Sequence, residues 1–135
     1  MTTTNDEGIA LYEKWAKMWN GDLDLAADLL VAEGFILHLT DVGMQAGDPQ
    51  IVRGASVPEF QAMVVRVRNR YDTLVYRTQS GPFVDQDRGV VCAPWQAEAS
   101  QGSNSITIVG TDILGFRDGK IYEYWAINSA GGWHH

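Results

Sequence analysis

The stretch GTDILGFRDGKI, residues 110–121, carries the strongest structural pattern in the chain. Alternate side chains of a strand point to opposite faces, and residues 106–117 alternate between a mainly apolar and a mainly polar parity. Asp112 interrupts the apolar parity, which it shares with Ile108 and Leu114. A buried carboxylate is costly unless it is paired, hydrogen-bonded or protonated. The stretch therefore predicts a strand with a buried acid, followed by a tight hairpin at Asp118-Gly119.

Outward from this hairpin, the periodicities predict an α+β domain. A capping-box pattern, Ser56-Val57-Pro58-Glu59, opens the third of three helices. We expect helices at 8–20, 23–32 and 57–71, strands at 35–40, 73–80, 88–99, 104–117 and 120–128, and irregular chain at 41–54. This order favours one curved antiparallel sheet that wraps over the helices. The prediction is a single domain, 1–135, with residues 1–7 flexible and 134–135 read as part of a purification tag.

Composition excludes several classes of protein. The chain has 135 residues and a formal net charge of −7, which argues against nucleic acid or an anionic membrane as partner. No run approaches the roughly 20 apolar residues that a membrane span needs. Cys92 is the only cysteine, so no internal disulfide can form, and we expect a cytoplasmic location.

The motifs of cofactor and metal enzymes are missing from the sequence. It contains no G-x-G-x-x-G, P-loop, H-E-x-x-H, CxxC or G-x-S-x-G pattern. His38 and Cys92 are too isolated to indicate a zinc site. We therefore expect no cofactor and no metal, and either acid–base chemistry or binding in an apolar pocket.

Two titratable residues are candidates for that chemistry, each with a structural alternative. Asp112 is either a carboxylate satisfied by Thr, Tyr or backbone partners, or an acid that burial keeps protonated near neutrality. His38 is either a hydrogen-bonded core or rim residue, or a general base whose ordinary pKa suits cellular pH.

Aromatic side chains are the third candidate group. Most are expected in the core, but a cavity lined by Trp and Tyr suits flat or polycyclic ligands. The candidate binding residues are Trp15, Trp19, Trp95, Trp125, Tyr124 and Asn128. Arg66, Arg68 and Arg70 are predicted to form a solvated basic face of the third helix.

Three segments together resemble the nuclear transport factor 2-like superfamily. Trp19-Asn20-Gly21-Asp22-Leu23-Asp24 is similar to its N-x-G-D-L-D junction, and Arg53-Gly54 to its R-G entry before a helix. Residues 112–125 resemble its closing D-x-x-R-x-x-D-G-K-I-x-E-x-W signature, with Gly115 in place of Arg. The resemblance spans nearly the whole chain. It implies a cone with a deep pocket, and a homodimer formed through the sheet.

Within that superfamily the resemblance is strongest to SnoaL-like polyketide cyclases and ketosteroid isomerases. It places Asp112 at the cyclases' acid–base aspartate and at the isomerases' protonated oxyanion-hole acid. An alignment without gaps places the isomerase base at His38 and its oxyanion tyrosine at Lys14. The cyclases' histidine on the preceding strand is replaced by Gln96 or Glu98. No Asp-Arg-Asp cluster of epoxide hydrolases is found.

Two hypotheses follow. In the first, the chain is an enzyme on a hydrophobic, carbonyl-bearing small molecule: His38 abstracts a proton next to the carbonyl, and Asp112 donates to the enolate oxygen. The outcome would be cyclisation, isomerisation or dehydration; epoxide hydrolysis is a weaker alternative. In the second, the same fold is a non-catalytic binding or dimerisation module. The first hypothesis requires His38 and Asp112 to open onto one cavity.

Overall fold

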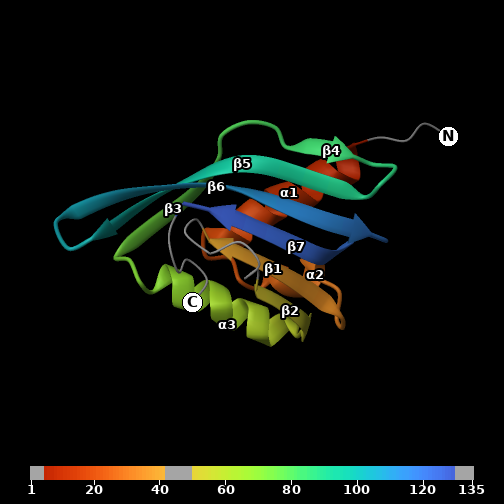
Figure 1. Ribbon diagram of the computed structural model, residues 1–135, viewed down its shortest axis with the longest axis horizontal. Coiled ribbons are helices and arrows are strands. Elements are labelled where there is room, and N and C mark those ends of the chain that lie inside the picture. Colours follow the sequence, from red (N-terminus) through yellow and green to blue (C-terminus); the bar gives the residue numbers. More distant parts are fainter. Residues whose placement is uncertain (1–4, 42–49, 130–135) are drawn as a thin grey trace.

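The computed structural model describes residues 5–41 and 50–129, which form three helices and seven strands (Figure 1). The residues of the expected tag lie outside this part. In chain order the elements are α1 (Asp6–Trp19), α2 (Leu25–Leu29), β1 (Phe35–Asp41), β2 (Gln50–Ala55), α3 (Val57–Arg68), β3 (Thr73–Thr78), β4 (Phe83–Asp85), β5 (Val90–Gln101), β6 (Asn104–Arg117) and β7 (Lys120–Asn128).

All seven strands belong to one curved sheet. The strand order is β2-β1-β7-β6-β5-β3, and the short β4 also pairs with β5. Every pairing is antiparallel except that of β1 with β7, which is parallel. In Figure 1, α1 lies behind the central strands and α3 runs below them. The α+β architecture predicted from the sequence is confirmed.

The predicted helices form for the expected local reasons. α1 buries one apolar stripe that includes Trp15 and Trp19. Ser56 caps α3: its hydroxyl accepts from the Glu59 N–H at 3.2 Å, and the Glu59 carboxylate reaches back to the Ser56 N–H. Asp6 and Glu7 already belong to α1, so the predicted flexible start is helical from residue 6.

Three segments differ from the sequence prediction. Residues 50–55, expected to be irregular, form β2, because their backbone pairs with the edge of β1. β4 was not predicted, since three residues carry too little periodicity to read. α2 is shorter than expected because Leu30 leaves the helix and bridges to Ile121 of β7.

The hairpin between β6 and β7, within residues 110–121, has the turn that its sequence predicts. Asp118 and Gly119 have φ angles of 52° and 74°, as a tight turn of the mirror-image type requires. The register shifts between Gly115 and Phe116, where β7 has one extra residue, Tyr122. The Tyr122 ring lies against Gly115, and the Arg117 guanidinium lies over it, 4.3 Å from the centre of the Tyr122 ring. The hairpin thereby fixes the β6–β7 register.

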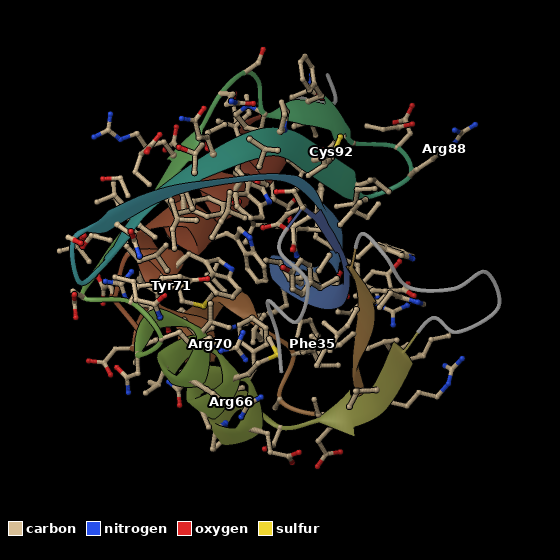
Figure 2. The ribbon with its side chains drawn as sticks, turned by 60° about the vertical axis from the view of Figure 1, so that its left-hand side comes forward. Phe35, Arg66, Arg70, Tyr71, Arg88 and Cys92 are labelled. Carbon is tan, nitrogen blue, oxygen red and sulfur yellow. The ribbon has the colours of Figure 1, made fainter. Side chains whose placement is uncertain are left out.

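The curved sheet encloses an interior filled with large side chains. In Figure 2 the ribbon bends around these side chains, Phe35 among them, whereas Arg88 extends away from them. Trp15, Trp19 and Trp95 are among the largest fully buried residues. Their rings meet Phe60 of α3 and tyrosines of the sheet, so aromatic contacts join all the layers.

Gly110 allows the Trp95 indole to lie across β6. The two residues are paired in the ladder, and a Cβ at Gly110 would lie 2.6 Å from the indole and 2.5 Å from the Ile127 carbonyl oxygen. Gly110→Ala should therefore lower the free energy of unfolding by about 1–3 kcal/mol, measured by urea denaturation. Ser105→Ala, at an exposed site of the same strand, is the control and should change it by less than about 0.5 kcal/mol. Equal stability of the two variants would contradict this packing.

Candidate functional site

Asp112 lies at the centre of the interior, on the concave face of β6. Its side chain is almost fully buried, with 1% relative exposure. Aromatic side chains donate to its carboxylate: Trp15 Nε1 to Oδ2 at 3.0 Å, the Tyr76 hydroxyl to Oδ2 at 2.9 Å, and the Tyr124 hydroxyl to Oδ1 at 3.1 Å. These donors come from α1, β3 and β7, so helix and sheet converge on a single carboxylate.

The protonation of Asp112 is set by two opposing effects. Burial, the larger one, raises the pKa of Asp112 from 3.8 to about 6, while hydrogen bonds from Trp15, Tyr76, Trp95 and Tyr124 lower it. A pKa of about 6 lies close enough to neutrality for Asp112 to gain or lose a proton in the physiological range.

A second tyrosine extends the network. The Tyr12 hydroxyl lies 2.6 Å from that of Tyr76, and a longer contact of 3.4 Å joins it to the Ala93 carbonyl oxygen. Burial, followed by the negative charge of Asp112, raises the pKa of Tyr76 and of Tyr124 well above 10, and burial also raises that of Tyr12. All three hydroxyls therefore remain protonated and available as donors.

His38 lies on the opposite face of the sheet. Leu37 and Leu39 are buried, whereas His38 is 20% exposed, as the alternation of β1 demands. Its Nε2 is 2.6 Å from Glu123 Oε2, and its ring stacks on Trp125 with centroids 4.9 Å apart. The structure does not bring His38 and Asp112 together. The alternation of β1 points His38 outward, so the residue that the gap-free alignment matches to the isomerase base does not face the interior.

The other candidate residues divide between these two faces. Trp15, Trp19, Trp95, Tyr124 and Asn128 are buried on the concave side with Asp112. Trp125 is half-buried on the outer side, stacked on His38. The sequence prediction that Trp125 lines the pocket is therefore corrected.

Two tyrosines of the site, Tyr12 and Tyr76, are not among the residues predicted from the sequence. Tyr12 lies on the apolar face of α1, and Tyr76 lies in β3, whose sequence contains no motif. The alternation of residues 73–78 places Leu74 and Tyr76 on the buried side, which was the available signal. The position at which the isomerase tyrosine was expected, Lys14, is exposed on α1.

The residues that replace the cyclase histidine also lie outside the interior. Gln96 donates to the Glu98 carboxylate on the outer face of β5, and Thr107 donates to the same carboxylate at 3.1 Å. Neither residue shares the face of Trp95 and Asp112. The hydrogen-bond partners of Asp112 on the concave face are therefore tyrosine and tryptophan rather than histidine.

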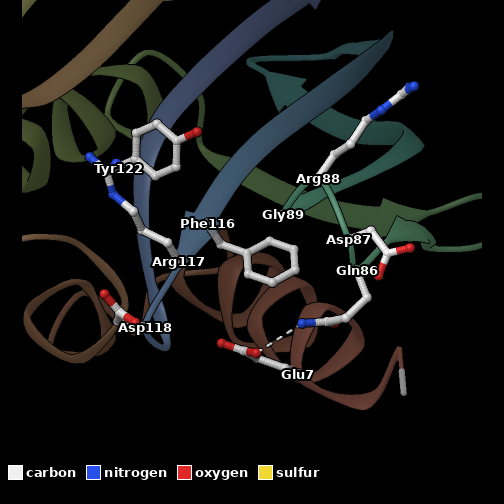
Figure 3. A pocket seen from close by; sticks show the side chains of 9 residues that line it. All are labelled: Glu7, Gln86, Asp87, Arg88, Gly89, Phe116, Arg117, Asp118 and Tyr122. Atoms are coloured by element: carbon white, nitrogen blue, oxygen red, sulfur yellow. Dashed lines mark hydrogen bonds between the residues drawn. The ribbon is translucent and has the colours of Figure 1, made fainter. Parts of the chain in front are cut away.

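A cavity of about 290 Å³ lies elsewhere, between the N-terminus of α1, the β4–β5 turn and the β6–β7 hairpin (Figure 3). Glu7 anchors its floor by accepting from Gln86 Nε2 at 3.0 Å and from the Gly119 N–H at 2.9 Å. Its rim carries Arg88 and Arg117 as well as Asp87 and Asp118, so it has no single charge preference. Asp112 does not line this cavity.

Two further observations concern residues 5–41 and 50–129. No helix there has the length and apolar character that crossing a bilayer requires. Within the same ranges, no three His, Cys, Asp or Glu side chains cluster closely enough to hold a metal ion.

Stability should depend on pH through Asp112. Its folded pKa of about 6 exceeds the unfolded value of 3.8, so the folded state holds this proton more tightly. The stabilisation of the folded state by this proton is fully present below pH 4 and is lost as the pH rises through 6. At about 1.4 kcal/mol per pH unit, the loss is roughly 3 kcal/mol.

Urea denaturation between pH 4 and pH 8 measures this effect. The unfolding free energy of the natural protein should fall relative to that of Asp112→Asn up to about pH 6.5, and then run parallel to it. A constant difference over the whole range would show that Asp112 keeps an ordinary pKa.

Comparison with known proteins identifies the fold. No family model matches the sequence, and no curated protein matches it significantly. Among solved structures, a "putative polyketide cyclase" from Acidithiobacillus ferrooxidans is 18% identical with a TM-score of 0.72, covering 98% of this chain and 94% of its own. A "putative SnoaL-like polyketide cyclase" from Jannaschia sp. CCS1 is 10% identical with a TM-score of 0.70, covering 91% and 85%.

A third similar structure carries a different activity in its name. An "LEH-like epoxide hydrolase" from M. tuberculosis is 16% identical, has a TM-score of 0.65, and covers 92% of this chain and 84% of its own. At identities this low, the structural similarity shows the fold alone, and the activities in the names of these proteins differ. The resemblance seen in the sequence is therefore confirmed at the level of the fold: this chain has the nuclear transport factor 2-like fold of the SnoaL-like polyketide cyclase structures.

Proposed function

We propose that this chain is a cofactor-independent acid–base enzyme for a hydrophobic, carbonyl-bearing small molecule, with Asp112 as its single acid–base group. The observation that carries this proposal is a buried carboxylate whose neighbours on the concave face are aromatic hydrogen-bond donors. Its pKa of about 6 suits a general base, which works best when its pKa lies near the operating pH. His38 has no part in it.

The proposed chemistry is proton abstraction from the carbon next to a carbonyl. An Asp112 oxygen takes the proton, the C–H electron pair forms the enolate double bond, and the carbonyl electrons move onto oxygen. The protonated Tyr76 and Tyr124 hydroxyls are donors that can stabilise the negative charge on that oxygen. Protonated Asp112 then returns the proton to a different atom of the product, which would complete a cyclisation or an isomerisation.

The substrate class follows from the walls of the interior. Trp15 donates to the carboxylate, and Trp19 and Trp95 stack on Tyr76 beside it. This flat apolar surface favours an aromatic or polyketide-like compound over a sugar or a nucleotide. The similar structures named as polyketide cyclases support the same class. With a single cysteine, the protein suits the reducing cytoplasm.

A second candidate function is a non-catalytic module that binds a small molecule. The observation in its favour is that both Asp112 oxygens already accept hydrogen bonds while the residue is 1% exposed. A fully satisfied carboxylate of this kind can serve to hold the core together. A substrate must then share or displace one of the aromatic donors.

Exchange of α-protons with solvent deuterium tests catalysis without knowledge of the natural substrate. We expect the protein to accelerate deuterium uptake by 2-tetralone in D₂O, followed by proton NMR. The rate should rise with pH to a plateau above about 6, because the ionised form of Asp112 is the base. Asp112→Asn should lower it roughly 100-fold or more.

His38→Ala is the matched control on the opposite face and should exchange at the natural rate. An equal loss of exchange rate in His38→Ala would show that His38 takes part in the reaction. Saturable quenching of tryptophan fluorescence by 2-tetralone, without faster exchange, would instead favour the binding module.

We propose further that the outer face of the sheet pairs with a second copy of the chain. Val109 and Ile127 are each 45% exposed there, on neighbouring strands, beside the half-buried Trp125. Exposed apolar surface in the middle of a sheet face is typical of a subunit interface. The resemblance seen in the sequence implies the same homodimer.

Sedimentation velocity tests this pairing. The natural protein should sediment at twice the mass of the chain, and Ile127→Asp at the monomer mass, because a buried unpaired charge opposes association. Lys17→Asp, on the exposed side of α1, is the control and should remain dimeric. A natural protein that sediments as a monomer would refute the proposal.

A further inference from the structure

Tyr76 belongs to an edge strand whose free edge needs hydrogen-bond partners. β3 pairs only with β5 among the described strands. The Gln79 N–H, just after β3, donates to the Pro94 carbonyl oxygen of β5 at 2.9 Å. Backbone groups of successive residues alternate between the two edges of an antiparallel strand. Those of Tyr76, three residues earlier, therefore point away from β5, where no strand receives them.

Asn20 supplies these missing partners with a single side chain. Its Nδ2 donates to the Tyr76 carbonyl oxygen at 2.9 Å, and its Oδ1 accepts from the Tyr76 N–H at 2.7 Å. The amide thus takes the place of one residue of a neighbouring strand. Because Asn20 is exposed and could bond to water instead, these two hydrogen bonds add little to the stability of the fold. Their main effect is to fix the position of β3.

Arg68 reinforces the same junction from α3. Its Nη1 donates to the Trp19 carbonyl oxygen at 2.7 Å and to the Leu74 carbonyl oxygen at 3.1 Å. Burial lowers the pKa of Arg68. The solvated basic face predicted from the sequence is therefore wrong for this residue, which joins the end of α1 to β3.

The joined elements both carry donors to Asp112. Asn20 caps the C-terminus of α1, whose Trp15 donates to the carboxylate, and it binds the backbone of Tyr76, which donates to the same oxygen. Tyr12 of α1 contacts the Tyr76 hydroxyl directly. A shift of β3 along α1 would therefore separate these groups from one another.

We propose that Asn20 is a positioning residue of the site, which holds the Tyr76 hydroxyl against the Asp112 carboxylate by binding both backbone polar groups of Tyr76. Asn20 touches neither the carboxylate nor a substrate, and it acts through Tyr76. A role of Asn20 in catalysis rests on the proposed function. Its effect on the hydrogen bond between Tyr76 and Asp112 is independent of that function.

The titration of Asp112 tests the positioning role without any substrate. In protein labelled with ¹³C in the aspartate carboxyl groups, the Asp112 signal is assigned by its loss in Asp112→Asn and followed from pH 4 to pH 8. The titratable groups facing it in the described structure are Tyr12, Tyr76 and Tyr124. None of them ionises in this range.

Asn20→Ala should raise the midpoint of this titration by roughly one pH unit, because a weakened Tyr76 hydrogen bond no longer favours the carboxylate. Asn20→Ser, whose hydroxyl can serve only one of the two backbone groups, should raise it by less. It replaces the alanine variant if that variant does not fold.

Two controls separate positioning from a general loss of stability. Gln61→Ala removes an amide-to-backbone bond that does not involve β3, from Gln61 Nε2 of α3 to the Leu23 carbonyl oxygen after α1 at 2.9 Å, and should leave the midpoint unchanged. In a Tyr76→Phe background, Asn20→Ala should cause no further shift, because the hydroxyl through which it acts is gone.

An unchanged midpoint in folded Asn20→Ala, or the same shift with and without the Tyr76 hydroxyl, would overturn the proposal. Either result would leave the exchange experiment on Asp112 untouched. Conversely, a protein without exchange activity whose Asp112 titration still responds to Asn20 would refute the enzyme function and keep the positioning role.

Discussion

The burial of one carboxylate is the constraint on which the rest of the structure depends. An ionised Asp112 in an apolar interior is tolerated only when its oxygens accept hydrogen bonds. The chain meets this need with Trp15 of α1, Tyr76 of β3 and Tyr124 of β7. Each donor lies on a different element. Formation of the complete set therefore requires the helix to be seated on the concave face and the sheet to have its full curvature.

The same arrangement explains why the site consists of aromatic donors. Tyrosine and tryptophan bring apolar area for the core together with one polar atom for the carboxylate. Their packing raises the pKa of Asp112 and their hydrogen bonds restrain that rise, so the value of about 6 is the balance of the two. A buried carboxylate with a pKa of about 6 is suited to proton transfer. For this reason we favour a single-residue mechanism over a pair.

The hairpin, the capping box and the long strands could all be predicted, since each rests on residues close together in the sequence. Asp112 was found in the same way, as a charge in an apolar parity. His38 shows where such reasoning fails. It was matched by a gap-free alignment from the Gly-Asp-Leu-Asp junction at residues 21–24, but the alternation of β1 turns its side chain to the outer face. Tyr76 and Asn20 could not be paired from the sequence, because 56 residues separate them.

The sequence by itself thus determined the α+β fold, the buried acid and its aromatic surroundings, because periodicity and turn chemistry are local properties of the chain. The tertiary structure alone decided which aromatic groups reach the carboxylate, and that His38 and Trp125 lie on the outer face. These features depend on how β3, β7 and α1 meet across long stretches of chain. Contacts of that kind are fixed by packing and by register, which no short segment encodes.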